Sequence, residues 1–465
     1  MSNFLLVNWG TKDKQYTFKT LEKKKLNIFL ATSKDHPSWV LDYIPKERLI
    51  YTNTYESDKL VVDVVNFMTE HQVKFDHIAT FFEMNMLQTA RLARYLNLSF
   101  LESEVVMRTS ANKYLMRNFC RRNKIVQPNY ALFRSEKEGL EVMSKLSKNY
   151  TRSVVIKPVV SGHSYGVLKI SGKGKKRYEA SFKQKLKFAH QQLNSNFDEW
   201  MKYNRFSQYF LIEEFVSGEM VSVDGLVVNN KIHFSSVTDF KISQPPLFLQ
   251  IETYIPSHLS NDSKKSIKKE AEKIIKTLGV DTVGFHCEFK VFKGEVFLIE
   301  FAARLPGGQM LEAYKQAYDI DLADLYLDCL MGKKLPTNKY SIKKYVLQES
   351  IPLSHEGKVK SVKGLNIFSR DKNLLLFSSV PVGKLIKKYG EIFEPLLYYQ
   401  AKATSKQELK QLQEMVKKKV KVEIVQSKIY RIYDLRDVLK KMMPAFLRKI
   451  LFNKGYLKRI VNFFE

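Results

Sequence analysis

The chain has 465 residues, of which 44% are hydrophobic and 27% are charged, and its formal net charge is +29. These proportions exclude an intrinsically disordered chain, and the length favours two to four domains. The three cysteines, Cys120, Cys287 and Cys329, lie far apart. That spacing excludes a disulfide framework and a CxxC metal site, so a reducing, cytoplasmic environment is expected.

Membrane insertion and secretion are not expected. No apolar run is long enough to span a bilayer, and the first four residues lack the basic and apolar regions of a signal peptide. The positive charge indicates an anionic partner such as a nucleotide, a nucleic acid or a membrane surface, although lysine is spread along the whole chain. Nucleic acid is disfavoured because the sequence has no zinc finger, RNP-like motif or Gly-x-x-Gly clamp.

The first hundred residues alternate between strands and helices. Apolar strands are expected at residues 4–8, 26–31, 49–52 and 77–82, and helices at 12–25, 58–71 and 85–96. This alternation predicts an open parallel sheet, which binds ligands beyond the carboxyl ends of its strands. Glu83 follows the fourth strand directly, so it is a candidate ligand contact, and a helix-capping acid is an equally good interpretation.

The regular alternation of strands and helices ends at Thr109. Ser110 is a candidate cap for a helix that runs to residue 123, and Lys113 lies in the first turn of this helix. A cation gains nothing from the helix dipole at that end, which favours another role for Lys113. Two strands, 154–157 and 167–170, flank a loop of small residues at 161–166. Such a hairpin tip could cover a phosphate with its backbone, although it lacks the Gly-Lys-Ser/Thr ending of a P-loop and could be an ordinary flexible hairpin.

The most informative segment is a predicted hairpin at residues 288–300. Its two alternating strands place Glu288 and Glu300 side by side, with Arg304 just beyond. Neighbouring carboxylates repel each other unless a cation lies between them, and oxygen ligands suit Mg²⁺. A nearby guanidinium suits an anionic substrate or a phosphoryl group. The alternative is a cross-strand pair neutralised by Lys290 or Lys293.

The last hundred residues divide into two parts. Short strands and a helix between residues 343 and 425 predict a compact α+β lobe. Residues 427–465 carry ten Lys or Arg against three acids, with apolar residues at helical spacing. This basic, amphipathic tail could lie on an anionic membrane surface or pack on its own protein, and the two interpretations have equal weight.

The order of motifs resembles the ATP-grasp superfamily, nearest to its carboxylate–amine ligases such as the L-amino-acid dipeptide ligases. The motifs are SANKYLMR (110–117), VIKP (155–158), LIEEFVSGE (211–219), CEF (287–289) and LIE (298–300). The resemblance covers residues 113–332 and implies an α/β and α+β multidomain fold. Its expected parts are an N-terminal open parallel α/β domain (1–107), an ATP-grasp domain of two α+β subdomains that clamp ATP (108–335), a small C-terminal α+β lobe (340–426) and the helical tail (427–465).

The resemblance also implies roles for individual residues. For ATP binding it implies Lys113, Lys157, Ser161, Gly162, Ser164, Gly166, Glu213, Glu214, Phe215, Val216 and Glu219. Glu288 and Glu300 would hold one or two Mg²⁺ ions, with Mn²⁺ as an alternative. Arg304 and Lys157 would be catalytic. Substrate contacts would come from Glu83, His286, Arg304, Gly307 and Gly308.

Plain structural interpretations compete with several of these roles. Lys113 and Lys157 could be solvated surface residues, and His286 could be a satisfied core histidine. Either glutamate of the 213–216 hinge could be an exposed strand residue. Gly307 and Gly308 could form a simple turn instead of permitting a close approach of the backbone to substrate.

One position departs from the resembled pattern. The superfamily often carries asparagine two residues after its second metal-binding glutamate, whereas this chain has Ala302. The amide is normally a third metal contact, so a second Mg²⁺ would lose a ligand or use water, and two-metal catalysis is in doubt. The retained glutamates, lysines and arginine argue against an inactive enzyme.

The expected function is therefore an ATP-dependent ligase that joins a small-molecule carboxylate to an amine through an acyl phosphate. The alternatives are another ATP-grasp ligase of biotin-carboxylase-like or formate-using type, and a membrane-docked nucleotide-binding accessory protein. The expected location is the cytoplasm, with peripheral attachment to the inner membrane face if the tail binds lipid.

Overall fold

The computed structural model describes residues 2–10, 15–162, 164–196, 198–243, 248–336, 340–352, 357–386 and 395–425. The chain forms two compact units. The first comprises Met1–Ser350, Asn373–Leu375 and Tyr399–Gln413, and the second comprises Ile351–Lys372, Leu376–Tyr398 and Glu414–Glu465. The predicted tail at 427–465 lies outside the described residues. The four predicted domain ranges stay a prediction, because these two units do not divide the first 350 residues further.

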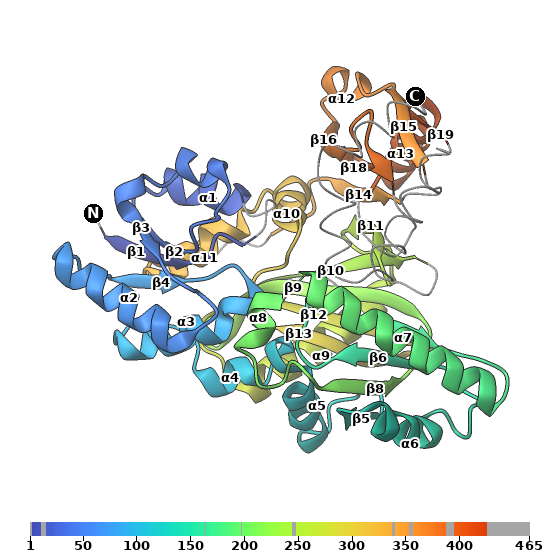
Figure 1. The fold of residues 1–465 in the computed structure, drawn as a ribbon. Helices are drawn as coiled ribbons and strands as arrows, with labels where there is room; N and C mark the ends of the chain where they lie inside the picture. Colours follow the sequence, from blue (N-terminus) through green and yellow to red (C-terminus); the bar gives the residue numbers. More distant parts are fainter. Residues whose placement is uncertain are drawn as a thin grey trace, which may run out of the picture. The chain divides into compact units, whose positions relative to one another are not determined.

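The N-terminal part of the first unit is an open parallel sheet, as predicted (Figure 1). Its strands are β1 (Asn3–Val7), β2 (Asn27–Thr32), β3 (Leu49–Tyr51) and β4 (His77–Ala79), in the order β3-β2-β1-β4. Alternate residues of β1 enter two different cores. Phe4 packs with α1 (Gln15–Lys23) on one face, and Leu5 packs with α2 (Ser57–Glu70) and α3 (Met86–Tyr95) on the other. Burial on both faces explains the continuous apolar strands that the sequence contains.

Short helical turns connect this sheet to the next part of the chain. They are η2 (Ser38–Asp42), η3 (Lys46–Arg48), η4 (Glu83–Asn85), α4 (Ser103–Met107) and η5 (Ser110–Asn112). The helix predicted from Ser110 begins three residues later, as α5 (Lys113–Arg122). Its cap is Asn112, whose side-chain oxygen accepts a 3.0 Å hydrogen bond from the Leu115 N–H. The prediction that Ser110 caps this helix is therefore wrong, because the intervening 3₁₀ turn moves the first α-helical residue to Lys113.

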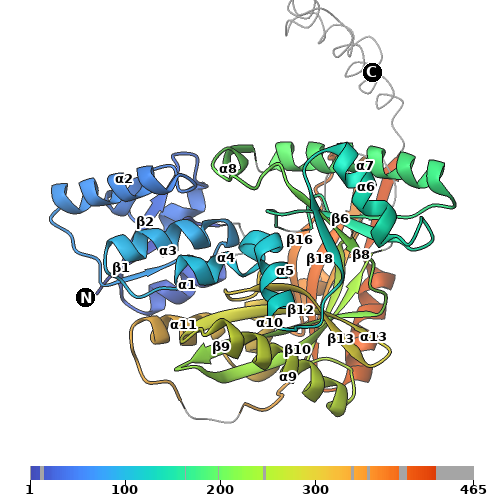
Figure 2. The same cartoon turned by 90° about the horizontal axis from the view of Figure 1, so that it is seen from below.

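A four-stranded antiparallel sheet follows, covered by two helices. Its strands are β5 (Tyr130–Phe133), β6 (Val154–Pro158), β7 (Leu168–Ile170) and β8 (Phe210–Glu214), in the order β5-β8-β6-β7. The helices α6 (Glu136–Leu146) and α7 (Lys175–Asn196) share its core, and α8 (Asp198–Lys202) follows α7. Figure 2 shows α6 and α7 beside β6 and β8. The predicted hairpin around residues 161–166 is confirmed, because β6 and β7 pair antiparallel.

The largest sheet has the order β13-β12-β9-β10-β11-β14-β18-β16. Its strands are β9 (Glu219–Val228), β10 (Lys231–Ile242), β11 (Gln250–Ile255), β12 (Val283–Phe292), β13 (Glu295–Ala302), β14 (Tyr345–Ile351), β16 (Leu374–Ser379) and β18 (Leu397–Ala403). Helix α9 (Asn261–Leu278) packs on residues such as Val223 of one face. Helices α10 (Met310–Tyr318) and α11 (Leu322–Leu330) pack on Leu226 and Phe234 of the other face.

The hairpin of β12 and β13 has the predicted register. Glu288 pairs directly with Glu300, and the ladder shifts by one residue between Glu288 and Phe289. The turn residues Lys293 and Gly294 both have positive φ, at 51° and 82°. Two successive left-handed residues are what a tight two-residue hairpin turn requires.

The second unit contains a small sheet of β17 (Leu385–Ile386), β15 (Gly357–Lys363) and β19 (Lys421–Val425), in that order. Val359, Val380, Ile386 and Leu396 form its core. Helix α12 (Ile367–Arg370) belongs to this unit, and α13 (Lys406–Lys419) is divided between the two units after Gln413, so the chain from Tyr345 to Val425 is α+β, as expected. Among the residues that the structure describes, none of the helices is long and apolar enough to cross a membrane.

Candidate active site

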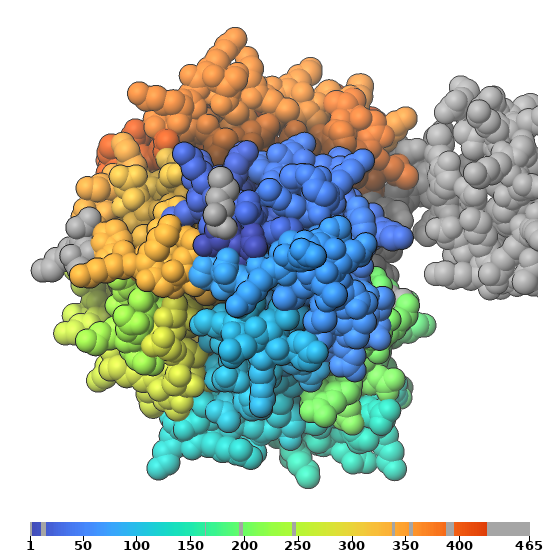
Figure 3. Space-filling model, turned by 90° about the vertical axis from the view of Figure 1, so that its left-hand side faces the viewer, coloured from blue at the N-terminus to red at the C-terminus, as the bar shows by residue number. Residues whose placement is uncertain are grey.

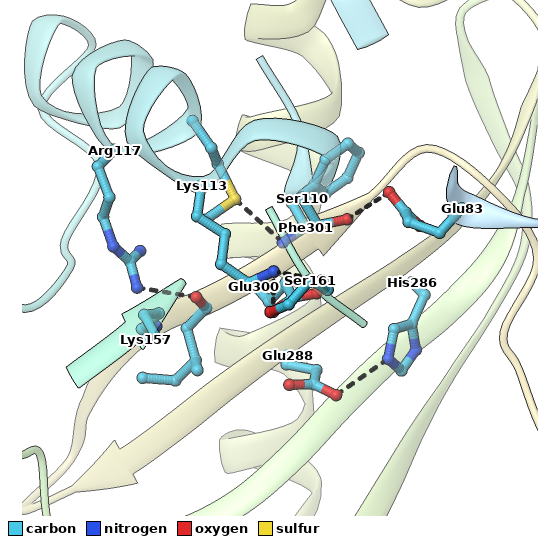
Figure 4. A network of polar contacts seen from close by, with 12 residues as sticks. Glu83, Ser110, Lys113, Arg117, Lys157, Ser161, His286, Glu288, Glu300 and Phe301 are labelled. Atoms are coloured by element: carbon cyan, nitrogen blue, oxygen red, sulfur yellow. Dashed lines mark hydrogen bonds and ion pairs between the residues drawn. The ribbon is translucent and has the colours of Figure 1, made fainter. Parts of the chain in front are cut away.

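The two hairpin carboxylates are the centre of the site (Figure 4). Glu288 and Glu300 lie opposite each other on β12 and β13, and both are partly buried. Burial and the negative charge of Glu288 raise the pKa of Glu300 above its usual range, against the opposing effect of Lys113. Burial also disfavours the charged form of Glu288, but contact with His286 outweighs it and lowers the pKa of Glu288. The pair is therefore electrostatically unfavourable without a cation.

Lys113 reaches this pair from the first residue of α5. Its Nζ donates a 2.8 Å hydrogen bond to the Ser161 carbonyl oxygen and lies 3.7 Å from Glu300 Oε2. The Lys113 backbone N–H also donates to the Val159 carbonyl, which fixes the start of the helix against the loop after β6. Lys113 is 3% exposed, so the interpretation as a solvated surface lysine is wrong.

Lys157 is buried in an ion-pair network with Glu213 and Arg117. Its Nζ lies 2.6 Å from Glu213 Oε2, while Arg117 Nε donates a 2.8 Å bond to Glu213 Oε1. Burial opposes ionisation of Glu213, but the two cations outweigh it and lower the pKa of this carboxyl to about 2. Burial and the charge of Arg117 lower the pKa of Lys157. The surface interpretation is wrong for Lys157 as well.

Arg117 is a member of the site that sequence reasoning missed. It is fully buried, and its guanidinium also donates to the carbonyl oxygens of Leu298 and Ile299, the two residues before Glu300. Arg117 thus ties β8 to the strand that carries the second carboxylate. The available signal was its spacing of four residues from Lys113, which places both side chains on one helix face.

The hinge after β8 separates the roles of its two glutamates. The Glu213 side chain points into the buried network, whereas Glu214 is partly exposed and accepts a 2.8 Å bond from the Asn129 amide. The backbone N–H groups of Glu214 and Phe215 already donate to the carbonyl oxygens of Asn129 and Ser153. Hydrogen bonds to an adenine would therefore come from the hinge carbonyl oxygens or from Val216. Glu219 is exposed at the start of β9, and its predicted role stays a prediction.

The loop between β6 and β7 contributes backbone groups to the same region. The Ser161 carbonyl is occupied by Lys113, and the Gly166 N–H donates to the Gln192 side chain at 2.9 Å. A side chain at Gly166, where φ is +73°, would lie 2.7 Å from the Pro158 ring. Gly162 and Ser164 belong to this loop, and Ser164 has a φ of 57°. Of the four predicted phosphate-covering residues, Gly166 thus already uses its backbone N–H within the protein, and the role of Ser161, Gly162 and Ser164 stays a prediction.

Arg304 and Glu83 meet although 221 positions separate them in the sequence. Arg304 Nε lies 2.5 Å from Glu83 Oε2, and the Ser110 hydroxyl donates a 2.7 Å bond to Glu83 Oε1. The Glu83 carboxylate thus accepts contacts from both Arg304 and Ser110. No side chain makes a capping hydrogen bond to the η4 turn, which begins at Glu83. Glu83 is the acidic residue of the first turn of η4 but makes no capping hydrogen bond, and its role as a ligand contact stays a prediction.

His286 is held by two carboxylates. Its Nδ1 contacts Asp224, and its Nε2 lies 3.2 Å from Glu288 Oε1. Burial opposes protonation, but Asp224 and Glu288 outweigh it and raise the pKa of His286 to about 10. Asp224, which the sequence analysis did not single out, is fully buried and also accepts hydrogen bonds from Ser222 and Tyr314. His286 is thus both a satisfied buried histidine and a contact of a candidate metal ligand.

Ala302, Gly307 and Gly308 contribute no polar side chain to this site. Ala302 is buried directly opposite His286 and offers no side-chain oxygen. Gly307 and Gly308 have open space where a side chain would project, so packing does not require glycine there. The φ of +60° at Gly308 favours glycine through the backbone alone, which supports the simple-turn interpretation.

The donor set fits a hard divalent cation. The two carboxylates supply only oxygen, and their mutual repulsion favours an ion between them. No group of three or more His, Cys, Asp and Glu residues suited to a metal occurs in the described part of the chain. A cation held by Glu288 and Glu300 would therefore complete its coordination with phosphate oxygens or water.

Comparison with known proteins agrees with this geometry. Residues 150–312 match the family model described as an ATP-grasp domain. An alanine–anticapsin ligase of Bacillus subtilis is 29% identical over 160 residues, which are 34% of this chain and 30% of the relative. The chain thus spans about 30% of the length of the curated relatives that it matches.

Solved structures share the fold over most of the chain. The L-amino acid ligase from Bacillus licheniformis has a TM-score of 0.73 and 18% identity, covering 91% of this chain and 99% of that one. A biotin carboxylase domain from Hydrogenobacter thermophilus, solved with MgADP and bicarbonate, has a TM-score of 0.64 and 12% identity, covering 99% and 98%. Residues 150–312 therefore form an ATP-grasp domain, and the chain has the ATP-grasp fold with distant homology to alanine–anticapsin ligases.

Proposed function

We propose that this protein is an ATP-dependent carboxylate–amine ligase that forms an amide bond and releases ADP and phosphate. The observation that carries the proposal is the convergence of Lys113, Glu288, Glu300 and the Arg304–Glu83 pair, with buried Lys157 behind them. The ATP-grasp domain and the distant relatives named as alanine–anticapsin and L-amino acid ligases support the same reaction class.

In this proposal the lysines bind the phosphates of ATP and the glutamates bind the metal ion. Lys113 and Lys157 would neutralise phosphate oxygens, with the loop 161–166 above them and the hinge 213–216 at the adenine. Glu288 and Glu300 would hold Mg²⁺, which when bound stabilises charge on the terminal phosphates. Ala302 leaves this pair without a third side-chain oxygen, so one fully coordinated ion is the simpler arrangement.

Arg304 would hold the acid. Its guanidinium can bind the substrate carboxylate, which takes the terminal phosphoryl group from ATP and becomes an acyl phosphate. The amine nitrogen then attacks the carbonyl carbon, the C–O bond to phosphate breaks, and the amine loses one proton. Phosphate is a far better leaving group than the original carboxylate oxygen, so no covalent enzyme nucleophile is required.

The substrates are proposed to be small amino acids or similar compounds, as the names of the relatives indicate for those proteins. We also propose a cytoplasmic location, because the three cysteines are free and the reaction consumes ATP. Membrane attachment through residues 427–465 stays a prediction, which sedimentation of the full chain and a 1–426 truncation with anionic liposomes would test.

The test is release of phosphate from ATP and Mg²⁺ across a matrix of acids and amines. We expect release that depends on both partners, together with an amide product of matching mass. ADP formation that requires bicarbonate or formate would instead favour a biotin-carboxylase-like or formate-using ligase. ATP hydrolysis that responds to no acid and amine would favour an accessory protein and contradict the proposal.

Replacing Arg304 with methionine should lower kcat/KM for the acid by about a hundredfold, because the carboxylate and the later oxyanion lose their cation. Arg304→Lys should recover part of the loss, since it keeps the charge but not the bidentate geometry. The matched control is Arg121→Met, an exposed arginine of α5. Equal kinetics for Arg304→Met and Arg121→Met would remove Arg304 from the site.

A further inference from the structure

A cavity of about 560 Å³ adjoins the Arg304–Glu83 pair. It lies among the start of α2, η4, α3, α4 and η5 on one side and α8 with residues 203–206 on the other. Figure 3 shows α8, in green, close to the blue N-terminal residues on one face of the molecule. Glu83, Ser110 and Ser161 belong both to the cavity wall and to the contacts of the active site. The volume is within the range of pockets for small organic ligands.

Two buried amides in the cavity wall each have an unused polar atom. Gln88 is 7% exposed, and its Nε2 donates to the Tyr55 carbonyl while its Oε1 has no partner among the described residues. Asn112 is fully buried, and its Oδ1 caps α5 while its Nδ2 has no partner there. Unpaired buried polar groups are costly. Both atoms are themselves shielded from solvent, so they mark incompletely satisfied positions in the wall rather than open contacts for a ligand.

The charge of the wall is opposite to that of the chain. Four carboxylates line the cavity, Glu56, Asp58, Glu83 and Glu104, against two guanidinium groups, Arg91 and Arg205. Glu83 is already paired with Arg304, and the Arg91 guanidinium donates to Ser57. No ion pair reaches the other three carboxylates within the described ranges. With Glu83 paired to Arg304, three carboxylates face two guanidinium groups, so the wall has a small net negative charge, opposite in sign to the net charge of +29 of the chain, which favours a positively charged ligand.

The rest of the wall is aromatic and apolar. Tyr55, Trp200 and Phe206 supply rings, and Met84, Leu87 and Leu115 supply aliphatic surface. Rings and methylene groups suit an aliphatic stem, and ring faces attract a cation. The cavity thus matches a molecule with an aliphatic stem and a cationic group.

We infer that this cavity takes the amine substrate and that this substrate is a basic amino acid, such as one with an ω-amino side chain. The inference rests on the proposed function. The acid must reach Arg304 beside the metal carboxylates, so the cavity on the other side of Glu83 is left for the attacking amine. An acidic wall there holds the side-chain ammonium while the α-amine faces the acyl phosphate.

The experiment compares L-lysine and L-ornithine with L-norleucine, which has the length of lysine without its ammonium, at a fixed acid and saturating MgATP. We expect the basic amines to have the higher kcat/KM, and mass spectrometry to show acylation of their α-nitrogen. In the double variant Glu56→Gln/Glu104→Gln, the lysine-to-norleucine ratio of kcat/KM should fall by at least about fivefold. The control Glu272→Gln, an exposed residue of α9, should keep the wild-type ratio.

The other possible outcomes show whether the substrate assignment or the proposed ligase activity itself is wrong. A preference for norleucine, or a ratio unchanged in the double variant, would overturn the basic substrate while amide formation still stands. Lysine consumed through its own carboxylate would overturn the assignment of the cavity to the amine. Phosphate release with no acid–amine pair at all would overturn the proposed function itself.

Discussion

Replacing Glu300 with glutamine should lower ATP-dependent amide formation by at least about a thousandfold, because the cation between Glu288 and Glu300 loses half of its protein charge. The fold should survive. Burial and Glu288 already raise the pKa of Glu300, so its ionisation at neutral pH costs stability, and a neutral side chain of equal size removes that repulsion. We expect the free energy of unfolding without ligands to stay within about 1 kcal/mol of wild type or to rise.

Melting curves with and without MgATP separate these two effects. Wild type should gain thermal stability from MgATP, because a ligand that binds only the folded state stabilises it, whereas Glu300→Gln should gain much less. Glu295→Gln is the matched control, since it makes the same change at the exposed start of the same strand and should keep full activity. Full activity of Glu300→Gln would refute its role at the metal, and a large loss of intrinsic stability would show that the carboxylate has a structural role instead.

Much of this site could be predicted because its residues lie on regular elements with a clear pattern. The alternation of β12 and β13 placed Glu288 and Glu300 together, and the register confirms it. Lys113 and Lys157 were found through motifs at the start of a helix and the end of an apolar strand. These patterns depend only on residues near each other in the sequence, so they can be recognised without knowledge of the tertiary structure.

The parts that were missed depend on contacts between distant segments. Arg117 joins α5 to β8 and β13, and nothing in its own helix shows which strands it reaches. Asp224 lies on β9, and its burial is explained by partners that include His286, 62 positions away, and Tyr314, 90 positions away. The choice between Glu213 and Glu214 was open because adjacent strand residues point to opposite faces, and only the position of Arg117 and Lys157 decides which face is buried.

Loss of the Arg117 guanidinium should strongly destabilise the first unit. Arg117→Met should lower the free energy of unfolding by about 3 to 5 kcal/mol, because it leaves the buried Glu213 with one cation instead of two and removes one buried and one partly buried hydrogen bond to carbonyl oxygens. Chemical denaturation followed by fluorescence measures the loss. Arg122→Met, an exposed position on the same helix, is the control and should change stability by less than about 0.5 kcal/mol.

The pH dependence of unfolding tests the same network from the side of Glu213. Its pKa falls from an ordinary value of 4.5 to about 2 on folding. A lowered folded-state pKa means that the stabilisation is present above about pH 4.5 and is lost as the pH falls toward 2. In Arg117→Met the folded-state pKa should move back up, since only Lys157 remains, so acid unfolding should begin at higher pH than in wild type or Arg122→Met. Parallel acid-unfolding curves for all three proteins would mean that Arg117 does not set the charge state of Glu213, and the predicted loss of stability would then have to come from its carbonyl contacts alone.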